Sequence, residues 1–173
     1  MPGLAPQPST PVNFDVPANA CDCHSHIFGP SDRFPMVAKR LYTPPPALPE
    51  ELAAMHQFCH FERVVVVTPS IYGSDNHATY YGMAAFPNYA AIVPLAKAFI
   101  AANPDRIVWG TDWPHPSPSP LPGKKFSDVN EDYPIDDGDM LNQLPKWAPD
   151  AAIREKILVT NPARLYDFPP VTK

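Results

Sequence analysis

The sequence ACDCHSHIFGP, residues 20–30, decides the class of fold because it places polar side chains within an apolar, strand-like run. The run ends in a Gly-Pro pair, which interrupts regular structure. Side chains alternate along a strand, so Asp22, His24 and His26 are expected on one face and the two cysteines on the other. Two histidines on one face can bind a divalent ion or hold a substrate carbonyl, but His-x-His alone does not distinguish a site from an ordinary strand.

Two further segments are typical of strands. The run RVVVV, residues 63–67, is continuously β-branched, as in strands buried on both faces of a parallel sheet. The run DRIVWGTD, residues 105–112, ends at Asp112, in the position where ligand sites of α/β folds collect. A carboxylate there could bind a metal or accept a proton from water, or it could simply cap the following turn.

Helical patterns lie between and after these strands. Apolar spacing predicts helices over residues 49–61 and 91–104, and weaker signals occur at 75–83, 136–144, 149–158 and 160–168. Alternation of strands and helices is α/β in kind. Three other histidines are expected to be surface or helix residues without a partner: His56, His60 and His77.

Composition and charge favour one globular domain and argue against several other classes of protein. A chain of 173 residues with 45% apolar and 18% charged residues fits one globular domain, while 26 prolines imply many loops. A net charge of -5 without a basic cluster argues against nucleic acid, and no apolar run reaches the about 20 residues that cross a membrane. Three cysteines and the lack of a signal-peptide pattern predict a cytoplasmic protein. Residues 1–19 are expected to form a flexible arm before a single domain over 20–173.

Several motifs follow one another along the chain: CDCHSHIFGP, VVVTPSIYGSDN, DRIVWGTDWPHP, DDG and LVTNPARLY. Together they resemble the amidohydrolase superfamily, in its amidohydrolase-related branch of (β/α)8 barrels. The resemblance covers residues 20–82 and 84–168 and is greatest to lactonases that act on 2-pyrone-4,6-dicarboxylate. It implies a hydrolase of aromatic-compound degradation whose partner is a small lactone or carboxylate.

The resemblance also implies roles for individual residues. His24 and His26 match the histidines that end the first barrel strand, and Asp112 matches the aspartate that deprotonates the attacking water. In relatives that use a metal, these positions hold one divalent ion, zinc or manganese; other relatives, these lactonases included, need no tightly held metal. Three more residues match substrate-contacting positions: Tyr42, Ser70 and His115. Ser117 stands where these lactonases have an asparagine, so that contact is not carried over.

The chain is short for such a barrel. A complete barrel needs roughly 250 residues, and only its first, second and eighth strands can be found among these 173 residues. Strand eight neighbours strand one in a closed barrel, so we expect a partial barrel of about three parallel strands in the order 2-1-8, with flanking helices. Its open edges and uncovered apolar faces favour self-association.

Three functions therefore stay open. The first is a hydrolase in which water activated by Asp112 attacks a lactone held near His24 and His26, with activity impaired by the missing segments. The second is a catalytically inactive, internally deleted product: a splice form, a pseudogene or a gene-model artefact. The third is a decarboxylase of the same superfamily, which releases carbon dioxide instead of opening a ring. The sequence leaves open whether this chain is an enzyme.

Overall fold

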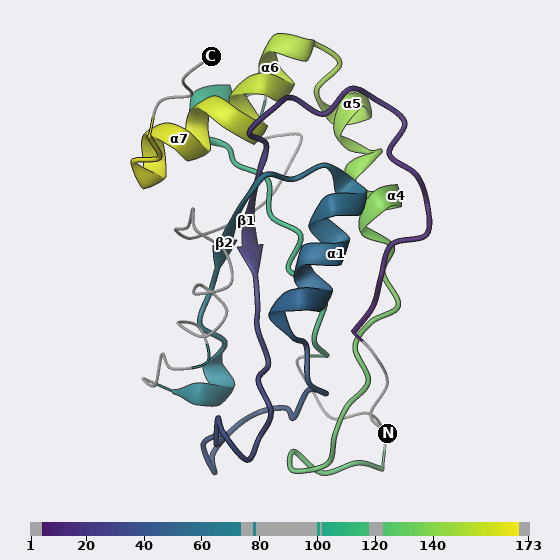
Figure 1. Ribbon diagram of the computed structural model, residues 1–173, viewed down its shortest axis with the longest axis vertical. Coiled ribbons are helices and arrows are strands. Elements are labelled where there is room, and N and C mark those ends of the chain that lie inside the picture. The colour runs from purple at the N-terminus through teal and green to yellow at the C-terminus, as the bar shows by residue number, and fades with distance from the viewer. Residues whose placement is uncertain (1–4, 74–77, 79–99, 101, 118–122, 170–173) are drawn as a thin grey trace.

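A computed structural model describes residues 5–73, 78, 100, 102–117 and 123–169 of the chain. The helices and strands are β1 (Cys21–Ser25), α1 (Pro49–Cys59), β2 (Arg63–Val66), η1 (Ser70–Tyr72), η2 (Pro104–Arg106), α4 (Asp137–Leu141), α5 (Leu144–Trp147), α6 (Ala151–Glu155), η3 (Lys156–Thr160) and α7 (Asn161–Tyr166). Figure 1 shows the two strands side by side, α1 beside them, and α6 and α7 near one end of the strands. Among the described residues, no helix is long and apolar enough to cross a membrane.

The strands β1 and β2 are parallel, so the α/β class with parallel strands is confirmed. Asp22 lies opposite Val64 and Ser25 opposite Val66, and the register is irregular between Asp22 and Ser25. Every residue of β2 is buried, as the run of valines predicts. The cysteines of β1 pack in a small cluster with Val65, apart from the main core, which agrees with the face predicted for them.

The segment 107–113 lies along the other side of β1, so the spatial order is β2, β1, then 107–113. Three backbone hydrogen bonds join it to β1: Cys23 N–H to Trp109 O at 2.7 Å, Asp112 N–H to His24 O at 2.6 Å, and His26 N–H to Trp113 O at 2.7 Å. The segment is nevertheless not a regular strand. One reason is that the N–H of Thr111 is donated to the Asp22 side chain, 2.8 Å away, and not to the backbone of β1.

Helix α1 packs its apolar face against the core and starts as its sequence predicts. Pro49 occupies the first turn, and the carboxylate of Glu51 accepts the N–H of Leu48 at 2.7 Å. His56 lies on a helix, as one of the two predicted alternatives has it, but the prediction that it has no partner is wrong. His56 is only 5% exposed, and its ring contacts Asp22 on β1. Apolar spacing identified the buried face of the helix but could not reveal a buried carboxylate opposite it.

The remaining helix predictions have mixed outcomes. The helix expected over 136–144 is observed as the shorter α4, and α5 begins only at the last residue of that range. The helices α6, η3 and α7 follow one another without a break over residues 151–166. The segments predicted as helices at 75–83 and 91–104 fall largely outside the described residues, as does His77.

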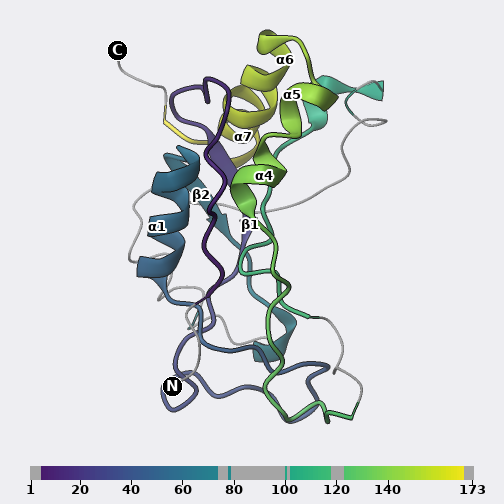
Figure 2. The same ribbon diagram turned by 90° about the vertical axis from the view of Figure 1, so that its right-hand side faces the viewer.

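Residues 5–19, predicted as a flexible arm, lie between α1 and α4 before entering β1 (Figure 2). The N–H of Ala5 donates to Glu51 of α1 at 3.0 Å. At the other side, Asp136 accepts the N–H and hydroxyl groups of Ser9 and Thr10. The structure thus places this segment against the two helices that flank it.

Gly110 permits the close approach of the segment 107–113 to β1. A Cβ atom at this position would lie 2.6 Å from the Cβ of His24. We therefore expect Gly110→Ala to lower the free energy of unfolding by about 1–3 kcal/mol, the usual cost of an overpacked interior. Urea unfolding followed by tryptophan fluorescence measures the change. Ser127→Thr, which adds a carbon on an exposed loop, is the control, and equal stability of the two variants would contradict the close packing.

Candidate functional site

Two histidines and one aspartate converge where β1 and the segment 107–113 end. The Nε2 atoms of His24 and His26 each lie 3.1 Å from Oδ1 of Asp112. One potential ligand atom from each residue lies within 4.8 Å of the other two. Asp112 has a φ of +63°, a left-handed conformation that aspartate adopts more readily than most residues. The structure therefore brings together the three residues that the sequence nominated.

The cluster is open to solvent on the side of the carboxylate. The side chain of Asp112 is 58% exposed, whereas those of His24 and His26 are 19% and 10% exposed. Partial burial opposes ionisation, but hydrogen bonds from both histidines hold the pKa of Asp112 well below its usual range. Asp112 is thus an anion at neutral pH that water or a small ligand can reach.

The orientation of His26 is fixed by its second ring nitrogen. Nδ1 lies 2.9 Å from the carbonyl oxygen of Val67, and because a carbonyl can only accept, Nδ1 carries a proton. A neutral His26 then directs an Nε2 lone pair toward the carboxylate of Asp112, which is also an acceptor. A second proton on the ring or a cation between the two groups resolves this conflict. A backbone carbonyl behind a histidine is also the arrangement found behind metal ligands, so the residues fit a divalent ion.

Two of the three predicted substrate contacts lie together near this cluster. Tyr42 and Ser70 form a side-chain hydrogen bond, and burial raises the pKa of the Tyr42 hydroxyl. The ring of Tyr42 meets Phe28 edge-on at 6.4 Å, and Phe28 in turn stacks on His26 at 5.9 Å. Tyr42 is therefore separated from His26 by one aromatic ring.

The third predicted contact, His115, is directed elsewhere. Its Nε2 lies 3.1 and 3.2 Å from the two carboxylate oxygens of Asp137. His115 is 4% exposed and Asp137 is 2% exposed. The ring of His115 is thus engaged by a buried carboxylate and does not join His24, His26 and Asp112.

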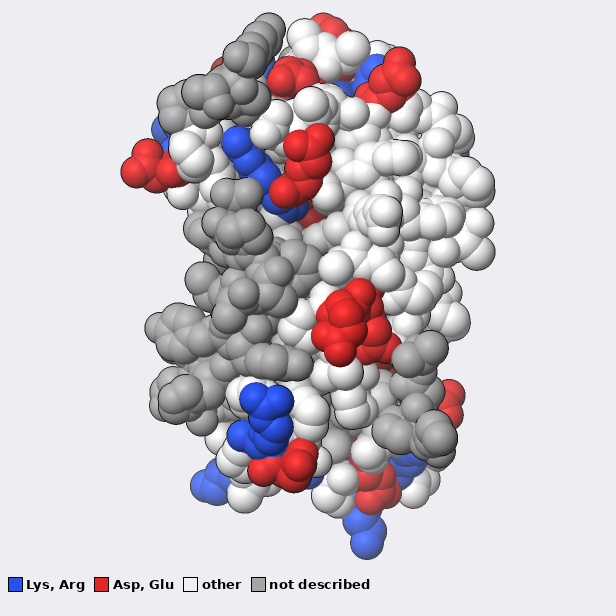
Figure 3. All heavy atoms as spheres, viewed as in Figure 1, with Lys and Arg blue, Asp and Glu red and all other residues white. Residues whose placement is uncertain are grey.

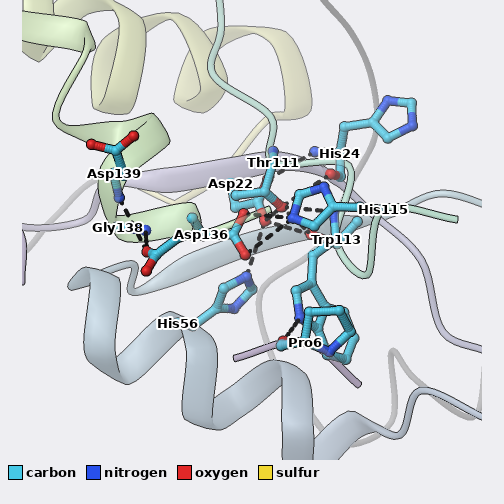
Figure 4. Close-up of polar contacts among 12 residues, drawn as sticks. Pro6, Asp22, His24, His56, Thr111, Trp113, His115, Asp136, Gly138 and Asp139 are labelled. Carbon is cyan, nitrogen blue, oxygen red and sulfur yellow. Dashed lines mark hydrogen bonds and ion pairs between the residues drawn. The ribbon is translucent and has the colours of Figure 1, made fainter. Parts of the chain in front are cut away.

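Asp22 does not share the environment of the two histidines, contrary to the alternation expected from the sequence. The irregularity between Asp22 and Ser25 ends that alternation. In Figure 4 the ring of His24 points away, while Asp22, His56 and Thr111 converge. The carboxylate of Asp22 is fully buried and accepts hydrogen bonds from β1 and from two other segments. On β1 the donors are the Ser25 hydroxyl and the N–H of His24, which is 3.1 Å away. The others are His56 Nε2 at 3.1 Å and the N–H and hydroxyl of Thr111 at 2.8 and 2.6 Å. Burial alone would raise the pKa of Asp22, but His56 and these donors lower it.

Sequence reasoning also missed Asp132. Both of its carboxylate oxygens are buried and have no hydrogen-bond partner among the residues that the structure describes. Burial raises the pKa of Asp132 to about 7, with the charge of His115 acting against the rise and that of Glu51 adding to it. Nothing in the surrounding acidic loop distinguishes Asp132 from its exposed neighbours, so no sequence signal could have found it.

The face of the molecule in Figure 3 carries charges of both signs. Acidic and basic side chains lie there in small groups, some of them side by side, and the Lys and Arg residues that are described do not gather into one broad patch. The described part of this face therefore shows no extended basic surface of the kind that binds a nucleic-acid backbone.

Comparisons with known proteins identify the family that this chain resembles. The family model described as Amidohydrolase matches residues 21–93 and 77–168. A 4-sulfomuconolactone hydrolase of Rhizobium radiobacter is 23% identical over 291 aligned positions, which cover 91% of this chain and 93% of that protein. A 2-pyrone-4,6-dicarboxylate hydrolase of Comamonas testosteroni is 34% identical over 105 residues, covering 61% of this chain and 27% of that protein.

One further relative and one solved structure are also similar to this chain. A second 4-sulfomuconolactone hydrolase, from Hydrogenophaga intermedia, is 42% identical over 80 residues, which cover 46% of this chain and 23% of that protein. The chain thus matches about a quarter of the length of two of these relatives. An apo crystal structure from Agrobacterium tumefaciens superposes with a TM-score of 0.64 at 16% identity, covering 95% of this chain and 99% of that one. The last similarity concerns the fold alone.

The role of Asp22 can be tested by Asp22→Asn. This variant leaves His56 and the Thr111 donors facing a neutral amide, so we expect the free energy of unfolding to fall by about 3–5 kcal/mol, as when one partner of a buried ion pair is removed. Urea denaturation gives the value. Asp32→Asn, at an exposed position, should change stability by less than about 0.5 kcal/mol. A loss for Asp22→Asn no larger than that of the control would contradict the proposed importance of Asp22.

The raised pKa of Asp132 should make the free energy of unfolding of the protein depend on pH. Its pKa in the folded protein, about 7, exceeds the unfolded value of 3.8, so the folded state binds more protons than the unfolded state between these values. This group therefore removes stability as the pH rises toward 7. We expect the wild type to lose more stability between about pH 5 and about pH 8 than Asp132→Asn does. The exposed Asp128→Asn should follow the wild type, and parallel curves for Asp132→Asn and the wild type would refute the prediction.

Proposed function

The chain belongs to the amidohydrolase family, and on that premise we propose that it is a lactonase-like hydrolase that opens a small carboxylated lactone, such as 2-pyrone-4,6-dicarboxylate, by water attack. The observation that carries the proposal is the convergence of His24 and His26 on the ionised, solvent-accessible Asp112. Relatives named as hydrolases of sulfomuconolactone and of 2-pyrone-4,6-dicarboxylate support the substrate class.

The proposed reaction uses the three residues in distinct roles. A lactone carbonyl lies beside the two histidines, and Asp112 accepts a proton as the oxygen of water bonds to the carbonyl carbon. The ring C–O bond then breaks, the ring oxygen receives the proton from Asp112, and the new carboxylic acid loses the remaining proton of the water to solvent and leaves as a carboxylate. The low pKa makes Asp112 a weak base, so stabilisation of the negative oxygen at His24 and His26 has to supply the larger part of the acceleration.

One divalent ion, zinc or manganese, fits this site. His24 Nε2, His26 Nε2 and an oxygen of Asp112 would hold it, because their ligand atoms lie close enough together. When bound, the ion polarises the carbonyl and lowers the pKa of water. In the metal-free alternative, a doubly protonated His26 provides the positive charge, and its Nδ1 remains bound to Val67.

A catalytically inactive, internally deleted product is the second candidate. Its support is the alignment to the Rhizobium relative, whose 291 positions far exceed the 173 residues of this chain. A partial barrel in the order 2-1-8 agrees with the segments β2, β1 and 107–113, and it leaves the site less enclosed than a closed barrel would. We expect lower activity than in longer relatives, and association of chains through the open sheet edge.

The proposal also includes the bounds of the domain, two substrate contacts and the location of the protein. We take residues 20–173 as one truncated domain of this family, with its N-terminal part over 20–82 and its C-terminal part over 84–168. Tyr42 and Ser70 remain proposed substrate contacts, because Tyr42 lies beside Phe28 and Ser70 is hydrogen-bonded to Tyr42. The proposed location is the cytoplasm. A decarboxylase using the same histidines is the lesser alternative.

An assay of ring opening tests the proposal. The ultraviolet absorbance of 2-pyrone-4,6-dicarboxylate is followed with and without added Zn²⁺ or Mn²⁺, for the wild type, Asp112→Asn and the exposed control Asp128→Asn. Asp112→Asn should lower kcat by about 10²–10⁴-fold, the usual contribution of a general base, because asparagine retains the backbone conformation but accepts no proton.

Each outcome of this assay has a definite meaning. A cooperative urea transition without any ring opening would favour the inactive product. Release of carbon dioxide would favour the decarboxylase, and equal rates for Asp112→Asn and the wild type would exclude Asp112 as the base.

A further inference from the structure

The turn that carries Asp112 is held in an unfavourable backbone conformation. Asp112 and His115 have φ values of +63° and +65°, in the left-handed region that non-glycine residues seldom occupy, although aspartate and histidine do so more often than most. The N–H of His115 donates to the carbonyl of Asp112 at 2.8 Å, so the two residues are directly linked. Such conformations persist where the surrounding structure fixes them. The residues that fix this turn therefore affect where Asp112 lies.

A buried carboxylate holds the far end of the turn. Asp137, the first residue of α4, accepts from His115 Nε2 with both oxygens at 3.1 and 3.2 Å. His115 and Asp137 are nearly inaccessible to solvent, at 4% and 2% exposure. The hydrogen bond between them is therefore largely shielded from solvent.

The start of α4 is itself fastened to the N-terminal segment. Asp136 caps the helix through Gly138 and Asp139 with one carboxylate oxygen and accepts from Ser9 and Thr10 with the other. A Cβ atom on Gly138 would lie 1.9 Å from the carbonyl oxygen of Thr10, so the two backbones touch.

Trp113, inside the turn, is fastened to the same segment. Its Nε1 donates to the carbonyl of Pro6 at 2.8 Å, and Figure 4 shows the two residues together. The start of α4 and the turn that carries Asp112 are thus both attached to residues 6–10 of the N-terminal segment.

We propose that Asp137 is a positioning residue: by holding the ring of His115, it fixes the turn 112–115 and thereby places the carboxylate of Asp112 opposite His24 and His26. This inference gives His115 a role different from the substrate contact that the sequence suggested, because Nε2 of His115 is already hydrogen-bonded to both oxygens of Asp137. The expected effect of Asp137 on metal binding and catalysis rests on the proposed function, but its expected effect on the geometry of the turn does not.

The test compares Asp137→Asn with Asp139→Asn, on the same helix but exposed. The first readout needs neither metal nor substrate: amide signals in ¹H–¹⁵N NMR spectra of the folded proteins. Asp137→Asn should shift the signals of His24, Asp112 and Trp113, whereas Asp139→Asn should leave them in place. The second readout is the affinity for Co²⁺, titrated by visible absorbance, which Asp137→Asn should weaken by at least about tenfold.

A double-variant comparison tests whether Asp137 acts through His115. If it does, the combination of His115→Asn and Asp137→Asn binds Co²⁺ no more weakly than His115→Asn alone. Additive losses would overturn the proposal. Unchanged amide signals and Co²⁺ affinity in folded Asp137→Asn would overturn it as well.

Two remaining outcomes are also informative. If the wild type binds no Co²⁺, the metal site in the proposed function fails, and the amide signals alone decide the positioning role. If Asp137→Asn does not fold, Asp137→Glu replaces it, since it keeps the charge and moves the carboxylate by one methylene. We expect smaller shifts of the same amide signals for Asp137→Glu, and no shift would again overturn the proposal.

Discussion

The arrangement of the site depends on how one buried charge is satisfied. A carboxylate without access to water is costly unless donors surround it, and Asp22 obtains its donors from β1, from His56 of α1 and from Thr111. Thr111 immediately precedes Asp112, and His24 is two residues beyond Asp22. The carboxylate in the interior therefore couples the helix, the central strand and the segment that ends in Asp112.

The same interaction explains why the third segment is extended but irregular. In a regular parallel ladder the N–H of Thr111 would pair with the backbone of β1, yet it is donated to Asp22. The ladder resumes beyond this point, where the N–H of Asp112 reaches the carbonyl of His24. The local departure from sheet geometry thus occurs one residue before the proposed base.

The sequence was sufficient for features that follow from local pattern. The valine run predicted the buried strand β2. Local pattern suggested Asp112 and the two histidines only as separate candidates, and the prediction that Asp112 lies beside His24 and His26 came from the family resemblance. It was insufficient where a contact joins distant segments. Strand alternation misplaced Asp22, because alternation holds only while the strand is regular, and helical spacing misjudged His56. The pairing of His115 with Asp137 joins residues that are 22 positions apart, and no local pattern encodes it.

The attachment of the N-terminal segment to α4 has a consequence for the order of folding. Ser9 binds Asp136 across a separation of 127 residues, and Asn142 binds the carbonyl of Pro11 across 131. Contacts this distant along the chain close large loops and tend to form late. During synthesis the strands β1 and β2 can pair early, whereas the turn that carries Asp112 lacks its outer support until α4 has left the ribosome. The proposed positioning of Asp112 by Asp137 is thus possible only after α4 has been synthesised.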